Sequence, residues 1–259
     1  MEIETLTENG VGRVELNRPE QMNALTVDLV RQIGDAGTQL VAEGARAIVL
    51  TGRGNTFCAG ADLGLVREAL DGSPQKVLTP LVDELHNAIR TLRSLPVPLV
   101  AAIEGPAVGA GLGLALTADL RVASVSARFI PGYTGIGSSP DGGVSYYLPR
   151  MLGAARATRV LLLNESLDAQ QAMEWGLVDE VVEAGSATVA ATALAKRLSS
   201  APPLAILRVR ELLDASTGQG LSEHLDHEQR LVTELWETHD FHEGVSSFLE
   251  RRKPGFTGR

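Results

Sequence analysis

Two short apolar stretches, residues 47–50 and 99–103, constrain the fold of this chain more than any other feature. Both are continuous rather than alternating, which is typical of strands covered on both faces of a parallel sheet. Each is followed by a turn rich in glycine and alanine, and then by apolar residues at helical spacing in residues 62–70 and 112–116. The repeated strand–turn–helix order predicts an α/β fold with a mainly parallel sheet.

The two ends of the chain show different patterns. Residues 3–7 and 11–16 alternate apolar and polar side chains around Asn9-Gly10, which predicts a β-hairpin. From residue 148 onward the pattern is almost wholly helical. Further predicted elements are a strand over 120–123 and helices over 26–41 (capped by Thr26), 78–95, 154–163, 168–175, 187–199, 204–214, 221–237 and 241–251.

The helical pattern predicts two regions. Residues 1–200 form an α/β core that carries the functional site, and residues 201–259 form a helical region for packing and oligomerisation. No Ser/Gly-rich linker separates them, so we do not expect the second region to fold on its own.

Composition excludes several classes of protein. The net charge of −9, without a basic tract, argues against a nucleic-acid partner. A single cysteine excludes an intrachain disulfide and fits a reducing compartment. Residues 1–25 do not resemble a signal peptide, and no apolar run has membrane-spanning length. We therefore expect a cytoplasmic protein without a membrane partner.

Two turns predict an anion site made of backbone. Residues 57–63 read Phe-Cys-Ala-Gly-Ala-Asp-Leu, and residues 105–113 contain four glycines. Small residues at a helix start let a ligand approach unpaired N–H groups. Two such turns can bring two N–H donors to one point, which is the arrangement of an oxyanion hole.

Five segments, taken together, resemble motifs of the crotonase (enoyl-CoA hydratase/isomerase) superfamily. One reads Leu-Asn-Arg-Pro-Glu-Gln-Met-Asn-Ala-Leu, and another reads Ala-Gln-Gln-Ala-Met-Glu-Trp-Gly-Leu-Val. They follow one another in one register from about residue 3 to the end of the chain. The segments are residues 16–25, 57–63, 104–113, 169–178 and 248–256.

The resemblance implies a fold, an assembly and a substrate class. The fold is a crotonase-like spiral of ββα units with a helical C-terminal trimerisation region, in a homotrimer or homohexamer. The substrates are acyl-CoA thioesters. Coenzyme A then enters as part of the substrate, so no separate cofactor is implied.

The resemblance also assigns residues. The two oxyanion donors fall on the backbone N–H groups of Ala61 and Ala110. Lys253 and Phe256 are placed to reach a CoA bound to a neighbouring subunit. The other residues assigned to the substrate and its CoA are Gln21, Met22, Ala59, Asp62, Leu63, Gly109 and Tyr133.

The chain departs from the hydratase pattern at both of its glutamates. Gly113 stands in the place of the first and Tyr133 in the place of the second, and no other carboxylate lies between Arg121 and Pro140. Hydratases of this family use the two glutamates to hold and activate water. Hydration by that pair is therefore not expected.

Asp141 is the carboxylate that this region offers. It resembles the single acidic residue of the family's isomerases, and one carboxylate can remove a proton at one carbon and return it two carbons along. Two other roles stay open: a helix N-cap before residues 144–148, and the nucleophile that the family's dehalogenases carry near this position. The preferred prediction is an enoyl-CoA isomerase with Asp141 as acid/base.

Besides the dehalogenase-like nucleophile, two alternatives to an isomerase remain at this point. One is a hydratase with a rearranged residue set, its pocket shaped by Tyr133 and residues 71–79. The other is a module that binds CoA thioesters without catalysis.

The remaining polar residues are given structural roles: Asp62 as a helix cap, Glu104 and Asp119 at strand ends, Cys58 as a small buried residue, and His86 on a helix surface. The spaced pairs His224/His227 and His239/His242 fit acidic surface helices better than a metal site, so no metal is predicted.

Overall fold

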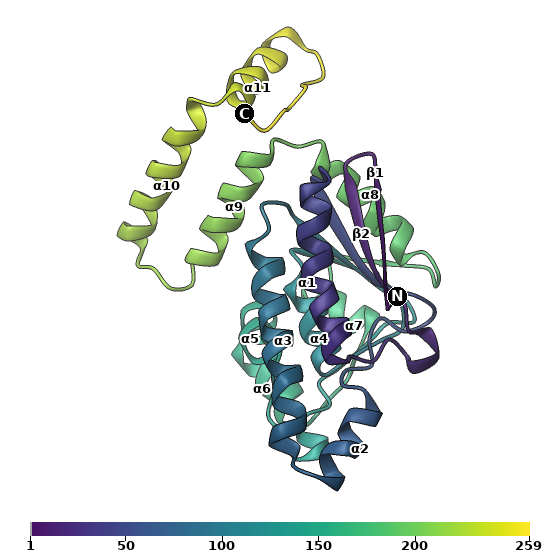
Figure 1. The fold of residues 1–259 in the computed structure, drawn as a ribbon. Helices are drawn as coiled ribbons and strands as arrows, with labels where there is room; N and C mark the ends of the chain where they lie inside the picture. Colours follow the sequence, from purple (N-terminus) through teal and green to yellow (C-terminus); the bar gives the residue numbers. More distant parts are fainter. Residues whose placement is uncertain (1) are drawn as a thin grey trace.

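Six strands form the central sheet of the computed structural model, which describes residues 2–259 (Figure 1). Strands β1 and β2 are the predicted hairpin, and every later neighbour in the sheet is parallel. The α/β class and the mainly parallel sheet are thus confirmed. In sheet order the strands are β1 (Ile3–Glu8), β2 (Val11–Leu16), β3 (Ala47–Gly52), β4 (Leu99–Ile103), β6 (Leu120–Ser124) and β9 (Glu180–Val182).

A second, smaller sheet was not predicted from the sequence. It consists of β5 (Pro106–Val108), β7 (Arg128–Ile130) and β8 (Leu167–Asp168). Strands of two or three residues are too short to show an alternating period, which explains why the pattern missed them. Strand β5 ends at Val108, directly before Gly109 of the second glycine-rich turn.

Helices cover both faces of the central sheet. On one face α1 (Val27–Ala42) and α3 (Pro74–Ser94) pack side by side over the larger apolar core, and on the other α8 (Ala187–Ser199) packs on β3, β4 and β6 (Figure 1). Thr26 caps α1 as predicted, its hydroxyl accepting a 3.1 Å hydrogen bond from the Leu29 N–H. Helix α3 begins four residues before the predicted start, because Pro74 fits the first turn of a helix, where its missing N–H costs nothing.

The other helices include the one that positions the site. Every residue of α4 (Ala110–Thr117) is buried, which makes it a fixed central element. Helix α5 (Val144–Leu152) packs against α4, and α2 (Leu63–Asp71) packs against α3. The rest are α6 (Ala154–Leu162), α7 (Ala169–Glu174), α9 (Pro203–Ala215), α10 (Leu221–Trp236), α11 (His239–Glu250) and the short 3-10 turns Pro19–Gln21 and Thr134–Ile136.

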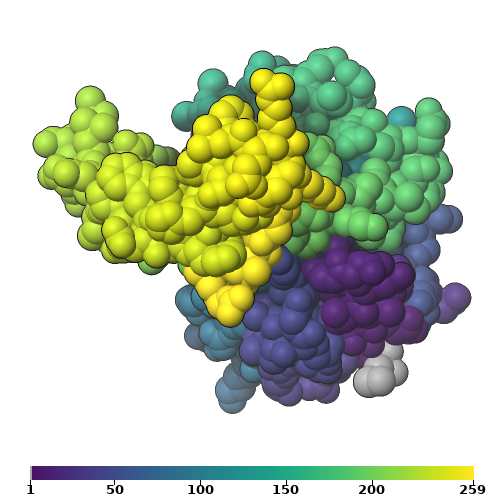
Figure 2. Space-filling view, turned by 90° about the horizontal axis from the view of Figure 1, so that it is seen from above, coloured from purple at the N-terminus to yellow at the C-terminus, as the bar shows by residue number. Residues whose placement is uncertain are grey.

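The three C-terminal helices, α9 to α11, extend away from the core (Figures 1 and 2). Arg46 ties both ends of this region to the core, donating to the carbonyl oxygens of Ala201 at 3.0 Å and Phe256 at 2.9 Å. Large apolar side chains on α10 and α11 stay exposed, among them Phe248 at 82% and Leu249 at 74%. The single chain therefore leaves an apolar surface on these helices uncovered.

Among residues 2–259, no helix combines the length and the apolar character needed to cross a membrane. In the same range, no group of three or more His, Cys, Asp or Glu side chains is arranged to hold a metal ion. His227 faces Glu211 instead, with 3.0 Å between its Nε2 and a carboxylate oxygen.

Candidate active site

The first glycine-rich turn is held like a strand against the segment before α1. Leu25 donates to the Gly60 carbonyl at 2.7 Å and accepts from the Asp62 N–H at 3.0 Å. In a parallel pairing of this kind the residue in between, Ala61, points its own N–H to the opposite side. Within residues 2–259 that N–H has no acceptor.

Asn23 and Arg18 fix this turn, and sequence reasoning missed both. The buried Asn23 side chain accepts from the Arg18 N–H at 3.0 Å and donates to the carbonyls of Arg53 (3.0 Å) and Thr56 (2.7 Å). The Arg18 guanidinium pairs with Asp62 at 3.0 Å. Asp62 in turn caps α2 by accepting from the Gly64 N–H at 2.7 Å, which confirms its predicted role as a cap.

The second turn meets the first backbone to backbone. A Cβ added to Gly60 would lie 2.9 Å from the Val108 oxygen and 3.9 Å from the Ala110 nitrogen, so only glycine fits there. Ala110 is the first residue of α4, and an N–H at that position has no acceptor inside its helix. The structure thus brings the two predicted turns together. Their role as donors stays a prediction.

Tyr133 links the second turn to Asp141. Its ring lies 3.9 Å from where a Cβ on Gly109 would be, and its hydroxyl donates to Asp141 Oδ1 at 2.8 Å. Burial, together with the negative charge of Asp141, raises the pKa of Tyr133 well above its usual value. The phenol therefore stays protonated and keeps donating to the carboxylate.

Gly113 shows why the first hydratase glutamate has no counterpart here. A Cβ at Gly113 would lie 2.5 Å from the carbonyl oxygen of Gly142, since α4 and the turn at residues 141–143 touch through their backbones. No side chain fits at Gly113 while the turn keeps this position. The turn needs glycines too, with φ of +54° at Gly142 and +78° at Gly143.

Near Asp141 the structure rules out one of the roles left open for this residue and contradicts the surface position predicted for His86. Asp141 does not cap α5: the N-cap is Gly143, no side chain caps it, and Asp141 contributes only its carbonyl, which accepts from the Val144 N–H at 3.1 Å. His86 is half-buried rather than on the helix surface, and its Nε2 accepts from the Gly142 N–H at 3.4 Å. No local pattern marks this contact, because residues 86 and 142 meet only in the fold.

The residues assigned to CoA fall into two groups. Gln21, Met22, Ala59 and Leu63 lie at the first turn, where the Met22 carbonyl accepts from the Ala59 N–H at 3.0 Å. Lys253 and Phe256 lie at the end of the C-terminal helices, where the Phe256 ring packs against Gly244 of α11, far from α2 (Figure 1). The single chain does not bring the two groups together.

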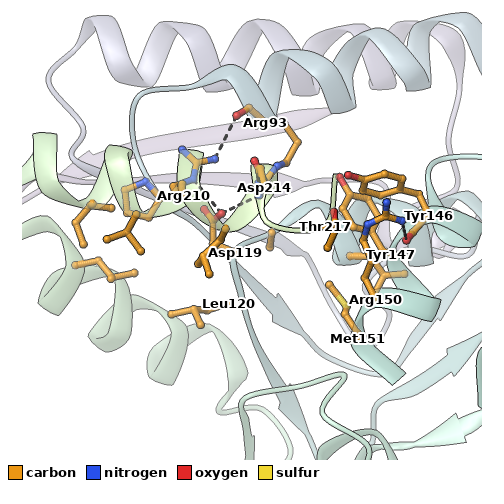
Figure 3. A pocket seen from close by; sticks show the side chains of 17 residues that line it. Arg93, Asp119, Leu120, Tyr146, Tyr147, Arg150, Met151, Arg210, Asp214 and Thr217 are labelled. Carbon is orange, nitrogen blue, oxygen red and sulfur yellow. Dashed lines mark hydrogen bonds and ion pairs between the residues drawn. The ribbon is translucent and has the colours of Figure 1, made fainter. Parts of the chain in front are cut away.

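A pocket of about 350 Å³ lies elsewhere, between α9 and the core (Figure 3). Asp119 stands at its centre and accepts hydrogen bonds from Arg93 at 2.8 Å and Arg210 at 3.0 Å, as well as from the Leu99 N–H at 2.8 Å. None of the candidate catalytic residues lines it. Arg210 lies on α9, so this pocket is part of the junction that attaches α9 to the core. The contacts of Asp119, directly before β6, confirm the structural role predicted for it.

Comparison with known proteins shows which protein family the chain belongs to. The family model for enoyl-CoA hydratase/isomerase matches residues 6–259. The chain is 39% identical to a "Probable enoyl-CoA hydratase" of Rhodobacter capsulatus, over 96% of this chain and 95% of that protein. It is 35% identical to the 1,2-epoxyphenylacetyl-CoA isomerase of Escherichia coli, over 97% of each.

A solved structure of the same family has the same fold as this chain. The crystal structure of an enoyl-CoA hydratase/isomerase family protein from Mycobacterium abscessus superposes with a TM-score of 0.94 at 38% identity, covering 99% of this chain and 100% of that one. Fold and motifs together define an enzyme class built on the crotonase fold. The chain belongs to the enoyl-CoA hydratase/isomerase family.

Proposed function

We propose that this enzyme moves a carbon–carbon double bond within an enoyl-CoA thioester, with Asp141 as the acid/base and the N–H groups of Ala61 and Ala110 as oxyanion donors. The observation that carries this proposal is the closed position at Gly113, where a Cβ would meet the Gly142 carbonyl at 2.5 Å. With Tyr133 in the place of the second glutamate, Asp141 is the carboxylate left for proton transfer.

The first step forms an enolate. The Asp141 carboxylate removes a proton from the carbon next to the thioester carbonyl, and the electron pair of that C–H bond moves onto the carbonyl oxygen. The N–H groups of Ala61 and Ala110 hold the oxygen while its charge develops. Losing one donor of this kind costs about 3 kcal/mol of transition-state stabilisation.

The second step returns the proton. Asp141, now a neutral acid, delivers it to a carbon two positions further along the acyl chain, and the electrons of the enolate form the new double bond. No water is consumed, so one positioned acid/base suffices. CoA belongs to the substrate in this scheme, and no other cofactor takes part.

Binding of the thioester is assigned to the same turns. We place the CoA along Gln21, Met22, Ala59, Asp62 and Leu63, with the carbonyl over Gly109. Lys253 and Phe256 would reach a CoA on a neighbouring subunit. We therefore also propose a homotrimer or homohexamer, which the uncovered apolar side chains of α10 and α11 support.

The relatives support this reading without deciding it. The E. coli relative is an isomerase by name, and a Streptococcus mutans relative at 30% identity is named trans-2-decenoyl-[acyl-carrier-protein] isomerase. The second candidate function is hydration, favoured by the name of the R. capsulatus relative. The missing glutamate pair weighs against it.

The test is the Asp141→Asn variant with a 3-enoyl-CoA substrate. We expect kcat for double-bond migration to fall by about a hundredfold or more, since the amide cannot accept the proton. Asp35→Asn, on the exposed face of α1, is the matched control and should keep wild-type activity.

Other results would replace the proposal. Migration that survives Asp141→Asn would remove Asp141 from the mechanism. Oxygen-18 in the Asp141 carboxylate after turnover in labelled water would identify a nucleophile. Tight binding of a CoA thioester without turnover of 2-enoyl-CoA or 3-enoyl-CoA would identify a binding module.

A further inference from the structure

Tyr133 is held in one place by its surroundings. The side chain is only 7% exposed and belongs to the main apolar core. The backbone around it is fixed as well: the Gly132 N–H donates to Asn164 at 2.8 Å, and the Tyr133 carbonyl accepts from the N–H groups of Ile136 at 3.1 Å and Ser138 at 2.9 Å. The ring therefore has a defined position next to the carboxylate it contacts.

The hydroxyl of Tyr133 occupies one oxygen of Asp141. It donates to Oδ1 at 2.8 Å and lies 3.4 Å from the Asp141 carbonyl oxygen. Within residues 2–259, the other carboxylate oxygen, Oδ2, accepts no hydrogen bond from the protein. The two oxygens of Asp141 thus differ: one is bound by a phenol, and the other is left for proton transfer.

The ring of Tyr133 also fills space on the side of the second turn. A Cβ added to Gly109, the residue directly before the oxyanion residue Ala110, would lie 3.9 Å from the Tyr133 ring, so the ring occupies the space beside this turn. A glutamate at this position in a hydratase holds a water, whereas a phenol of this size, packed in the core, puts carbon atoms there. A water that would bind Asp141 Oδ1 finds its position taken by the hydroxyl.

From this geometry we propose that Tyr133 is a positioning residue that sets the outcome of the reaction: it orients Asp141 for proton return and keeps water from the carboxylate, so that the enzyme isomerises rather than hydrates. This inference rests on the proposed isomerase function. Because the phenol stays protonated, it acts through its hydrogen bond and its bulk and gives up no proton of its own.

The alternative reaction defines what Tyr133 must prevent. With a water beside Asp141, the carboxylate can take a proton from that water. The oxygen of the water then adds to the third carbon of a 2-enoyl thioester. The enolate that forms is then protonated at the second carbon by the Asp141 acid. The product is a 3-hydroxyacyl-CoA, which is the substrate plus one water.

Two variants separate the hydrogen bond from the bulk. Tyr133→Phe removes only the hydroxyl, and we expect kcat for migration to fall about tenfold while KM stays within about twofold. Tyr133→Ala also opens the space, and we expect the ratio of 3-hydroxyacyl-CoA to migrated enoyl-CoA to rise about tenfold or more over wild type. Tyr146→Phe, an exposed tyrosine on α5, is the control and should change neither quantity.

The products of 3-enoyl-CoA and 2-enoyl-CoA turnover are measured by mass and by double-bond position. Suppose that the wild-type enzyme migrates the double bond, that Tyr133→Phe keeps full kcat, and that Tyr133→Ala keeps the wild-type product ratio. The role proposed for Tyr133 is then wrong, and the proposed isomerase function stands. A wild-type enzyme that does not migrate the bond overturns the proposed function, and this inference with it. If Tyr133→Ala does not fold, kcat of Tyr133→Phe decides, and an unchanged value contradicts the proposal.

Discussion

At the scale of single residues, burial decides what each side chain can do. Cys58 lies at the start of the first turn, and a Cβ on Gly111 would sit 2.8 Å from its sulfur. Burial raises the pKa of the Cys58 thiol to about 12. The reactive thiolate is therefore suppressed in the folded enzyme, and a structural role follows.

We predict that iodoacetamide at pH 8 leaves Cys58 unmodified in the folded enzyme and labels it rapidly in urea. The raised pKa also affects stability, because the thiol ionises near pH 9 in the unfolded chain and near pH 12 in the folded one. Its contribution to the stability of the fold is therefore present below pH 9 and is lost as the pH rises toward 12. Mass spectrometry of the labelled protein checks this. Complete labelling without urea, at the rate of a free thiol, would contradict the buried position.

At the scale of elements, the contact between α4 and the turn at residues 141–143 is the structural basis of the proposed chemistry. We predict that Gly113→Ala destabilises the enzyme by about 1–3 kcal/mol, because the added methyl forces two backbones apart. It should also lower isomerase activity by moving Asp141. Urea unfolding and kcat measure the two effects.

Gly218→Ala is the matched control for that variant. A Cβ at Gly218 meets nothing closer than the Ala215 carbonyl oxygen at 3.8 Å, so we expect a change in stability within about 0.5 kcal/mol. Equal stability of Gly113→Ala and Gly218→Ala would contradict the close approach between Gly113 and the Gly142 carbonyl.

The sequence predicted elements better than it predicted contacts between them. Long periodic helices and continuous apolar strands appeared at nearly the right residues, because their patterns are local. The pairing of Tyr133 with Asp141, the burial of His86 and the clamp made by Asn23 depend on segments that meet only in the fold. The three-residue strands β5 and β7 carry no period at all.

At the scale of the whole molecule, the C-terminal helices carry large apolar side chains that no other part of the described chain covers. Phe248 and Leu249 of α11 are mostly exposed, although an isolated protein gains by burying such side chains. In the proposed homotrimer or homohexamer, other copies of the chain would cover this surface.

We therefore predict that analytical ultracentrifugation finds three or six times the chain mass of 27.4 kDa. Replacing Phe248 and Leu249 together with aspartate should lower the mass toward that of the monomer, since charges in an apolar interface are costly. Glu250→Gln, at a neighbouring exposed position, is the control and should leave the assembly intact. A monomeric wild-type enzyme would contradict the proposed assembly.

In the proposed mechanism, one carboxylate moves a double bond without water. The most direct test is to supply the wild-type enzyme with a 3-enoyl-CoA and to determine the mass and double-bond position of the product. We predict a product of unchanged mass with its double bond next to the thioester. A product heavier by one water, formed without any migrated enoyl-CoA, would contradict this mechanism.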